Sequence, residues 1–274
     1  MKSFVRIAFL TGSMAFALSA GQSDAALTSV FQYRFPASYD GVNAAVTDQG
    51  PAAHNGTRTG TILLSTDVPA GAPVGAMSAI LDGTTANNVI KTTGTDLLTN
   101  TLVANAGGFT FDVWFKGTGG TATSGKLIDN AGTEYIAVVG SSTGTPTIFM
   151  STSDNIANRV TLGVADGLSI TDWNHITFSF VVTDTTNATL TGGNYVITLN
   201  GVTTTYTGKT MSNFGDTLNR PMSIGAHPTA TAAADRYNGL IYNPSAFLGV
   251  VPEPSTALLD LSAGMLLLRR RRRI

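Results

Sequence analysis

The stretch GGFTFDVWFKG, residues 107–117, decides the expected fold because its apolar and polar side chains alternate along almost its whole length. Large apolar side chains share one side of the extended chain, namely Phe109, Phe111, Val113 and Phe115. The other side carries Thr110, Asp112, Trp114 and Lys116. Successive side chains of a β-strand point to opposite faces, so this period of two predicts a strand with one buried face.

The same period recurs in other short runs. TSVFQYRFP places Phe31, Tyr33 and Phe35 on one side, and NHITFSFVV does the same with four apolar residues from Ile176 to Val182. NYVITLNGVTTTYTG has strands on both sides of Asn200-Gly201, a pair favoured in two-residue hairpin turns. The same criterion predicts two later strands, PMSIGAH and NGLIYNPSAFLGV. Many short strands without intervening helices predict an all-β sandwich or barrel.

The remaining segments give weaker signals. No segment after Leu27 shows sustained helical periodicity, so no helix is expected there. Residues 36–75 are rich in Gly, Ala, Pro and Asp, and we expect long surface loops from them. No internal repeat and no second composition zone occurs before Val250, which favours one domain over residues 27–250.

Composition excludes several classes of site. Charged residues make up only 12% of the 274, against about 25% in typical globular domains. The chain has no cysteine, which excludes disulfides and thiolate metal sites. Residues 27–250 hold nine Lys/Arg and fourteen Asp/Glu. Nucleic-acid binding needs clustered cations, so no nucleic-acid partner is expected.

The N-terminus is typical of a secretory signal peptide. Lys2 and Arg6 precede an apolar run from Ile7 to Ala20, and the small residues Ser23 and Ala25 follow. The run is shorter than the ~20 residues that a membrane-spanning helix requires, which weighs against the alternative of a retained anchor. We therefore predict that residues 1–26 are a cleaved signal peptide.

The order of motifs resembles the laminin G-like domains of the concanavalin A-like superfamily. The resemblance rests on six segments in the family's order across residues 27–250: YRFP, TDQGPAAHNGT with AILDG, FTFDVWFK, WNHITFSF, YVITLNGV, and MSIGA with YNGLI. It implies an antiparallel two-sheet jelly-roll sandwich with one concave sheet. Asn200 stands where the family usually has Asp, and both residues tolerate left-handed backbone geometry. After YNGLI the chain departs from the family pattern, so the closing strand is expected to pair differently or to be shorter.

Three neighbours on one strand face are the candidate ligand site. Asp112, Trp114 and Lys116 together look like a sugar-stacking platform, an aromatic ring flanked by polar groups. The alternative is that Trp114 packs under a loop or against a neighbouring strand, which is the usual role of this residue in the resembled family. Trp173, the only other tryptophan, is expected to plug the core or an edge.

Catalysis is not expected. His175 would need a nucleophile and an orienting carboxylate beside it, and a structural imidazole is the favoured interpretation. His54 and His227 lack zinc-ligand spacing. The superfamily's glycosidases carry two glutamates on one strand, whereas Glu134 is the only glutamate of residues 27–250. Two aspartates from separate loops remain an alternative route to hydrolysis.

Calcium is the one cofactor that the sequence suggests. The resembled jelly rolls often bind it at the sheet rim, through the oxygen ligands that it prefers. Asp129-Asn130 and Asp154-Asn155 are such pairs, both expected in loops. The alternative is that these residues stabilise turns through bonds from side chain to backbone.

The last 24 residues, 251–274, combine a Pro-Glu-Pro turn, an apolar stretch and a run of arginines. The apolar stretch from Ala257 to Leu268 would span about 18 Å as a helix, against a hydrocarbon core of roughly 30 Å. Asp260 interrupts it, at a cost on the order of 2–3 kcal/mol for insertion. A lasting membrane anchor is therefore not expected, and contact with the inner membrane would be transient.

This tail closely resembles the PEP-CTERM sorting signal of exopolysaccharide-producing Gram-negative bacteria. The residues that carry the resemblance are Pro252, Glu253, Pro254, Arg269, Arg270, Arg271, Arg272 and Arg273. It implies processing by an exosortase, a membrane cysteine protease, and delivery to the cell surface or extracellular matrix. Asp260 departs from the family's apolar helix.

These observations together predict an exported, non-catalytic module that binds a glycan associated with exopolysaccharide or biofilm. Two alternatives stay open. One is a structural or adhesive surface protein without a sugar site, and the other is an enzyme acting on polysaccharide.

Overall fold

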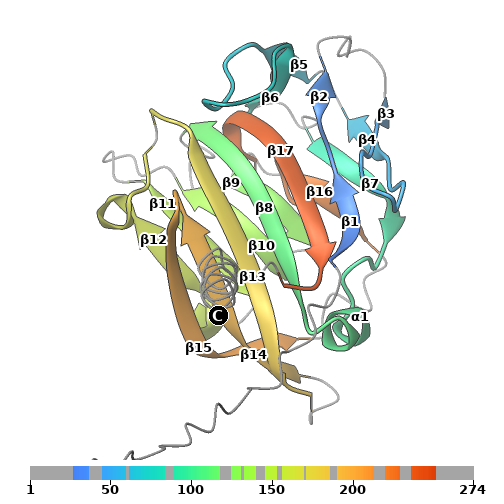
Figure 1. Ribbon diagram of the computed structural model, residues 1–274, viewed down its shortest axis with the longest axis vertical. Helices are drawn as coiled ribbons and strands as arrows, with labels where there is room; N and C mark the ends of the chain where they lie inside the picture. The colour runs from blue at the N-terminus through green and yellow to red at the C-terminus, as the bar shows by residue number, and fades with distance from the viewer. Residues whose placement is uncertain are drawn as a thin grey trace, which may run out of the picture.

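Two antiparallel sheets pack face to face around a shared hydrophobic core in the computed structural model. The structure describes residues 27–36, 45–59, 62–83, 89–117, 125–130, 133–139, 146–152, 156–169, 171–185, 190–212, 220–228 and 236–250. Figure 1 shows β13, β8 and β17 side by side in the front layer, with β9 and β10 behind them. The predicted all-β, antiparallel two-sheet sandwich is confirmed.

Among the described residues, the first sheet has nine strands. A continuous path of seven runs β15 (Val202–Ser212), β14 (Leu190–Leu199), β13 (Asn174–Asp184), β8 (Gly108–Gly117), β17 (Asn238–Leu248), β6 (Ala76–Asp82) and β2 (Phe35–Pro36). Beside this path, β1 (Thr28–Gln32) pairs with β17 and β5 (Leu63–Ser65) pairs with β6. The stretch that opened the sequence analysis is thus β8, in the middle of the sheet.

The second sheet has eight strands in the part of the chain that the structure describes. Their order is β12 (Val160–Gly163), β11 (Thr147–Thr152), β10 (Glu134–Val139), β9 (Gly125–Asn130), β16 (Pro221–Ile224), β7 (Val89–Thr95), β4 (Gly56–Thr59) and β3 (Ala45–Val46). Two single 3-10 turns, η1 (Ile156–Asn158) and η2 (Val164–Asp166), flank β12.

The apolar side of β8 lies in the core, as its period predicts. Phe109, Phe111, Val113 and Phe115 are all completely buried. Phe178 of β13 meets Phe109 edge to face at 5.7 Å between ring centroids, a preferred geometry for aromatic pairs. Fully burying one such side chain contributes about 1.5–3 kcal/mol to the free energy that stabilises the folded state. The aromatic ladder across β8 and β13 therefore holds the middle of the first sheet against the second.

The hairpin predicted at Asn200-Gly201 joins β14 to β15. Leu199 pairs with Val202, which leaves a two-residue turn. Asn200 has φ 51° and Gly201 has φ 85°, so both turn residues are in the left-handed region that this tight connection needs.

Two expectations about the less regular segments are wrong. A short helix, α1 (Asn100–Asn105), precedes β8, and the Thr99 side chain caps it by accepting a hydrogen bond from the Leu102 amide at 3.2 Å. Residues 36–75 are not only loops, because β3, β4 and β5 lie there. Each of these elements has six residues or fewer, which is too short for a periodic pattern to show.

The last strand changes partner halfway along one of its edges. The first part of β17, from Asn238 to Ile241, pairs with β6, whereas Ser245 to Leu248 pair with β1. An irregularity in register falls between Tyr242 and Ser245, and Asn243 there has φ 48°. At eleven residues the closing strand is not short, and it divides the pairing of one edge between two partners.

The predicted signal peptide, the predicted sorting signal and the Asp154-Asn155 pair lie outside the described residues. Within the described part of the chain, no helix has the length and apolar character needed to cross a membrane.

Candidate binding face

The polar side of β8 lies on the outer face of the nine-stranded sheet. Asp112, Trp114 and Lys116 are each partly exposed, while the residues between them are buried. Trp114 pairs with His175 of β13 on one side and with Tyr242 of β17 on the other. Paired residues share a face, so three neighbouring strands bring an indole, an imidazole and a phenol together.

His175 stacks on Trp114 and is held there by Asp112. The two rings lie 4.4 Å apart between centroids and 9° from parallel. His175 Nε2 is 2.9 Å from Asp112 Oδ2, and the Thr177 hydroxyl donates to the same oxygen at 2.7 Å. About a third of the His175 side chain is exposed. Trp114 therefore packs against a neighbouring strand, as the structural alternative expected, but it does so within a partly open polar face.

The Asp112–His175 pair has the carboxylate and the imidazole of a catalytic arrangement but lacks a nucleophile within the part of the chain that the structure describes. The orienting carboxylate that catalysis requires is present. Among the described residues, however, no hydroxyl group forms a hydrogen bond to the other ring nitrogen of His175. The geometry fits a carboxylate that fixes the orientation of an aromatic ring.

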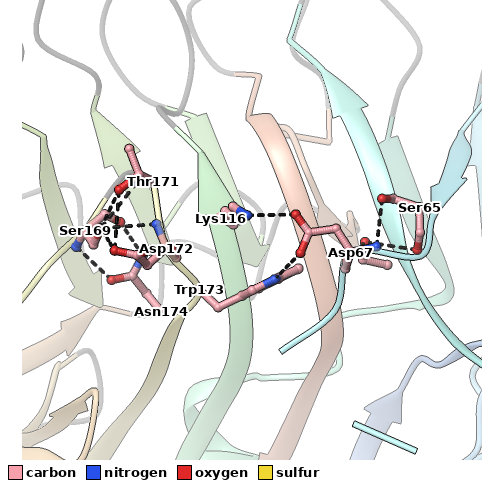
Figure 2. Close-up of polar contacts among 9 residues, drawn as sticks. Ser65, Asp67, Lys116, Ser169, Thr171, Asp172, Trp173 and Asn174 are labelled. Carbon is pink, nitrogen blue, oxygen red and sulfur yellow. Dashed lines mark hydrogen bonds and ion pairs between the residues drawn. The ribbon is translucent and has the colours of Figure 1, made fainter. Parts of the chain in front are cut away.

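Asp67 ties the loop after β5 across this face. Figure 2 shows its carboxylate between Lys116 and Trp173, with Lys116 Nζ at 2.7 Å and Trp173 Nε1 at 2.8 Å. These two hydrogen bonds hold the pKa of the Asp67 carboxyl below its usual range. Strand β6 also holds this loop, because the Ser78 hydroxyl donates a hydrogen bond to the Asp67 carbonyl at 2.7 Å. Lys116 therefore forms an ion pair with Asp67 and is also partly exposed to solvent.

Trp173 completes the aromatic part of the site. It precedes β13, is half-buried, and meets Tyr242 edge to face at 6.5 Å between centroids. Its expected role as an edge plug describes its packing but misses its polar contact to Asp67. We call Trp114, Trp173, His175 and Tyr242 the aromatic face. Trp114 and Trp173 keep part of their surface open, whereas Tyr242, which pairs with Trp114 and contacts Trp173, is only 7% exposed.

Sequence analysis missed Asp67 and Tyr242 as members of the site. Tyr242 could have been found, since it alternates with the buried Ile241 in the run NGLIY. Asp67 lies in a loop of the irregular segment, and no pattern in the sequence ties it to residues 49 and 106 positions away.

The predicted calcium pair Asp129-Asn130 does not fit a calcium site. The expected loop context is wrong, because the two are the last residues of β9. They pair with Tyr135 and Glu134 respectively, on opposite faces of the sheet, so their side chains do not converge. Asp129 lies 3.6 Å from Lys126, and Asn130 donates to Glu134 at 2.7 Å. Among the described residues, no three His, Asp or Glu side chains group as metal ligands.

Glu134 is buried in the core rather than placed in a cleft. Burial raises the pKa of its carboxyl to about 8, although hydrogen bonds from Thr133 and Asn130 act in the opposite direction. The Thr133 hydroxyl lies 2.5 Å from Oε2, while Oε1 is buried without a hydrogen bond. A polysaccharide bond cannot reach a side chain that is 1% exposed.

No protein-family model matches the chain, and no curated protein matches it. Solved structures do resemble it. One is the binding domain of Paraclostridial Mosquitocidal Protein 1, with 11% identity, a TM-score of 0.53, and coverage of 85% of this chain and 51% of that one. Another is the binding domain of botulinum neurotoxin serotype D/C, with 12% identity, a TM-score of 0.51, and coverage of 86% and 52%.

At these identities the likeness is one of fold. The chain spans about half the length of these two solved domains. Both are described as binding domains. In both cases the likeness in fold covers most of this chain.

Proposed function

We propose that the protein is a non-catalytic module that binds a glycan on the aromatic face. The observation that carries the proposal is the group of partly exposed rings, Trp114, His175 and Trp173, beside Asp112 and Lys116. A sugar ring offers an apolar C–H face to an aromatic ring and hydroxyl groups to polar neighbours. The resemblance to binding domains in fold supports this choice over an enzyme.

The burial of Glu134 supports a non-catalytic role. Hydrolysis of a glycosidic bond needs two carboxyl groups on either side of that bond. The exposed carboxylates described on this face, Asp67 and Asp112, are each engaged by cations or hydroxyl donors. They serve to orient their neighbours.

The proposal includes export. The signal peptide at residues 1–26 and the PEP-CTERM-like tail at residues 251–274 would take the protein through the inner membrane to an exosortase. The mature protein would act at the cell surface or in the extracellular matrix of a Gram-negative bacterium, where exopolysaccharide is the available glycan. Mass spectrometry of the secreted protein tests this, with cleavage expected after residue 26 and near Pro252-Glu253-Pro254.

A glycan array with the purified chain tests the binding function. We expect binding to a subset of glycans, lost in Trp114→Ala and kept in Val202→Ala, a control at an exposed apolar position in the β14–β15 hairpin. Circular dichroism of both variants must match the parent chain. Silence of the array, together with self-association that rises with concentration in light scattering, would replace this proposal with a structural or adhesive role. Release of reducing ends from a polysaccharide would instead establish an enzyme.

A further inference from the structure

A pocket of about 320 Å³ adjoins the aromatic face, and Tyr242 forms part of its wall. This volume is at the small end of the range for sites that bind small molecules. The other lining residues come from three separate segments: Arg34, Phe35 and Pro36; Gln49; and Pro73, Val74, Gly75 and Ala76, with Asn243 beside Tyr242. The pocket is therefore a product of the fold and not of one loop.

The change of partner along β17 places the pocket. Asn243 lies between the part of β17 that pairs with β6 and the part that pairs with β1. The Tyr33 amide donates to the Pro244 carbonyl at 3.0 Å, so the chain before Arg34 runs directly beside this irregularity. Pro36 pairs with Ala76 and closes a second side. Irregularities of this kind are common next to binding sites, because they redirect a side chain.

Arg34 gives the pocket its charge. The residue is exposed, and its guanidinium forms no hydrogen bond or ion pair with any part of the chain that the structure describes. None of the ten lining residues is acidic, although acidic residues outnumber basic ones in residues 27–250. A single cation in such surroundings favours an anionic ligand.

Asn243 adds an unused polar group. Its amide oxygen is buried and has no hydrogen-bond partner. A buried polar atom without a partner costs about 1–3 kcal/mol, and a ligand hydroxyl group that donates to it would offset this cost. Phe35, Pro36 and Pro73 meanwhile line the pocket with apolar surface, and Val74 is fully exposed at its edge.

We propose that this pocket binds the carboxylate-bearing residue of an acidic glycan, a hexuronic acid, with Arg34 pairing with the carboxylate. A guanidinium binds a carboxylate through two parallel hydrogen bonds. The apolar wall takes the C–H face of the same sugar, and Asn243 takes one of its hydroxyl groups. Tyr242 belongs to both the pocket and the aromatic face. The sugars next to the uronic acid in the glycan would therefore lie across Trp173 and Trp114. This inference rests on the proposed glycan-binding function and names its ligand class.

Isothermal titration calorimetry of the full chain tests the charge preference. The probes are oligosaccharides of glucuronate and of galacturonate, each compared with its carboxyl-reduced counterpart, which keeps the ring stereochemistry and removes the charge. We expect at least one acidic form to bind about tenfold more tightly than its reduced form. Arg34→Gln is expected to abolish that difference by lowering the affinity for the acidic form about tenfold. Arg34→Lys is expected to retain part of it.

Arg220→Gln is the matched control, because Arg220 is a cation that does not line the pocket and keeps its backbone contact to Asp96. Equal affinity for acidic and reduced forms overturns the inference, as does a preference that survives Arg34→Gln. Either result leaves the proposed function standing if Trp114→Ala still abolishes binding. Binding of inorganic phosphate that depends on Arg34, without binding of uronates, would assign the pocket to phosphate esters instead. If none of these oligosaccharides binds while the glycan array is positive, the inference fails and the proposed function stands; silence of both overturns both.

Discussion

The imidazole ring of His175 lies parallel to the indole ring of Trp114, with centroids 4.4 Å apart and planes 9° from parallel. Both residues lie on central strands of the sheet and pair directly across β13 and β8. The bond from His175 Nε2 to Asp112 then fixes the remaining rotation of the imidazole. A face whose rings are held in place before the ligand arrives loses less side-chain entropy on binding.

Asp112→Asn is expected to weaken glycan binding without unfolding the protein. Asparagine keeps the shape of the side chain but loses the charge that binds His175 and Thr177. A hydrogen bond to a charged group contributes about 1.5–3 kcal/mol when intact, and this one is partly exposed. We expect affinity to fall by about 3- to 10-fold in a binding titration, with a loss of about 1 kcal/mol in urea unfolding. Asp166→Asn, on the η2 turn, is the control. Unchanged affinity would mean that the stack does not depend on Asp112.

Asp67→Ala is expected to free Trp173 while leaving the fold intact. The Lys116 ion pair is largely exposed, so its loss should cost less than about 1 kcal/mol. Trp173 also loses the acceptor of its indole N–H. In a Trp114→Phe background, Trp173 is the only tryptophan, and its fluorescence should become easier to quench with acrylamide. Asp166→Ala should leave the quenching unchanged. If Asp67→Ala does not change the quenching of Trp173, the contact between this loop and Trp173 does not order the site.

The sequence predicted the strands more fully than the site. Alternation alone placed Asp112, Trp114 and Lys116 on one face, because a period of two determines the side of each residue once the strand is extended. It could not supply their partners. His175 lies opposite Trp114 only because β13 pairs with β8 in this register, and register depends on which strands become neighbours.

Contacts of loop residues and irregularities in strand pairing are harder still to predict from sequence patterns. Asp67 reaches Trp173 across 106 positions, and a single loop residue has no periodicity. The irregularity at Asn243 arises where β17 leaves β6 for β1, which is a property of the assembled sheet. The loop context expected for Asp129-Asn130 was wrong for a related reason. Asp129 and Asn130 have the composition of a turn but lie at the end of a buried strand.

Gly201→Ala is expected to destabilise the β14–β15 hairpin through the backbone alone. Gly201 has φ 85°, and a Cβ atom added there would meet nothing within 4 Å. The cost is therefore the strain of a left-handed alanine, about 1 kcal/mol. Gly163→Ala is the matched control, because Gly163 has φ −136° and its added Cβ would make only ordinary contacts at 3.8 Å and beyond. Urea unfolding should separate the two variants. Equal stability would show that the hairpin tolerates another turn.

Glu134→Gln is expected to change how stability depends on pH. Burial raises the pKa of Glu134 from 4.5 to about 8, so between these values the folded protein holds a proton that the unfolded chain has lost. The stabilising contribution of the protonated carboxyl is complete below pH 4.5 and declines as the pH rises towards 8. Glutamine does not titrate. The difference in unfolding free energy between variant and parent should therefore move in favour of the variant by about 1.4 kcal/mol per pH unit across this window. Urea unfolding from pH 5 to pH 8 measures it, with the exposed Asp172→Asn as control. Parallel curves for parent and Glu134→Gln would show that Glu134 is ionised within the core, held by Thr133 and Asn130.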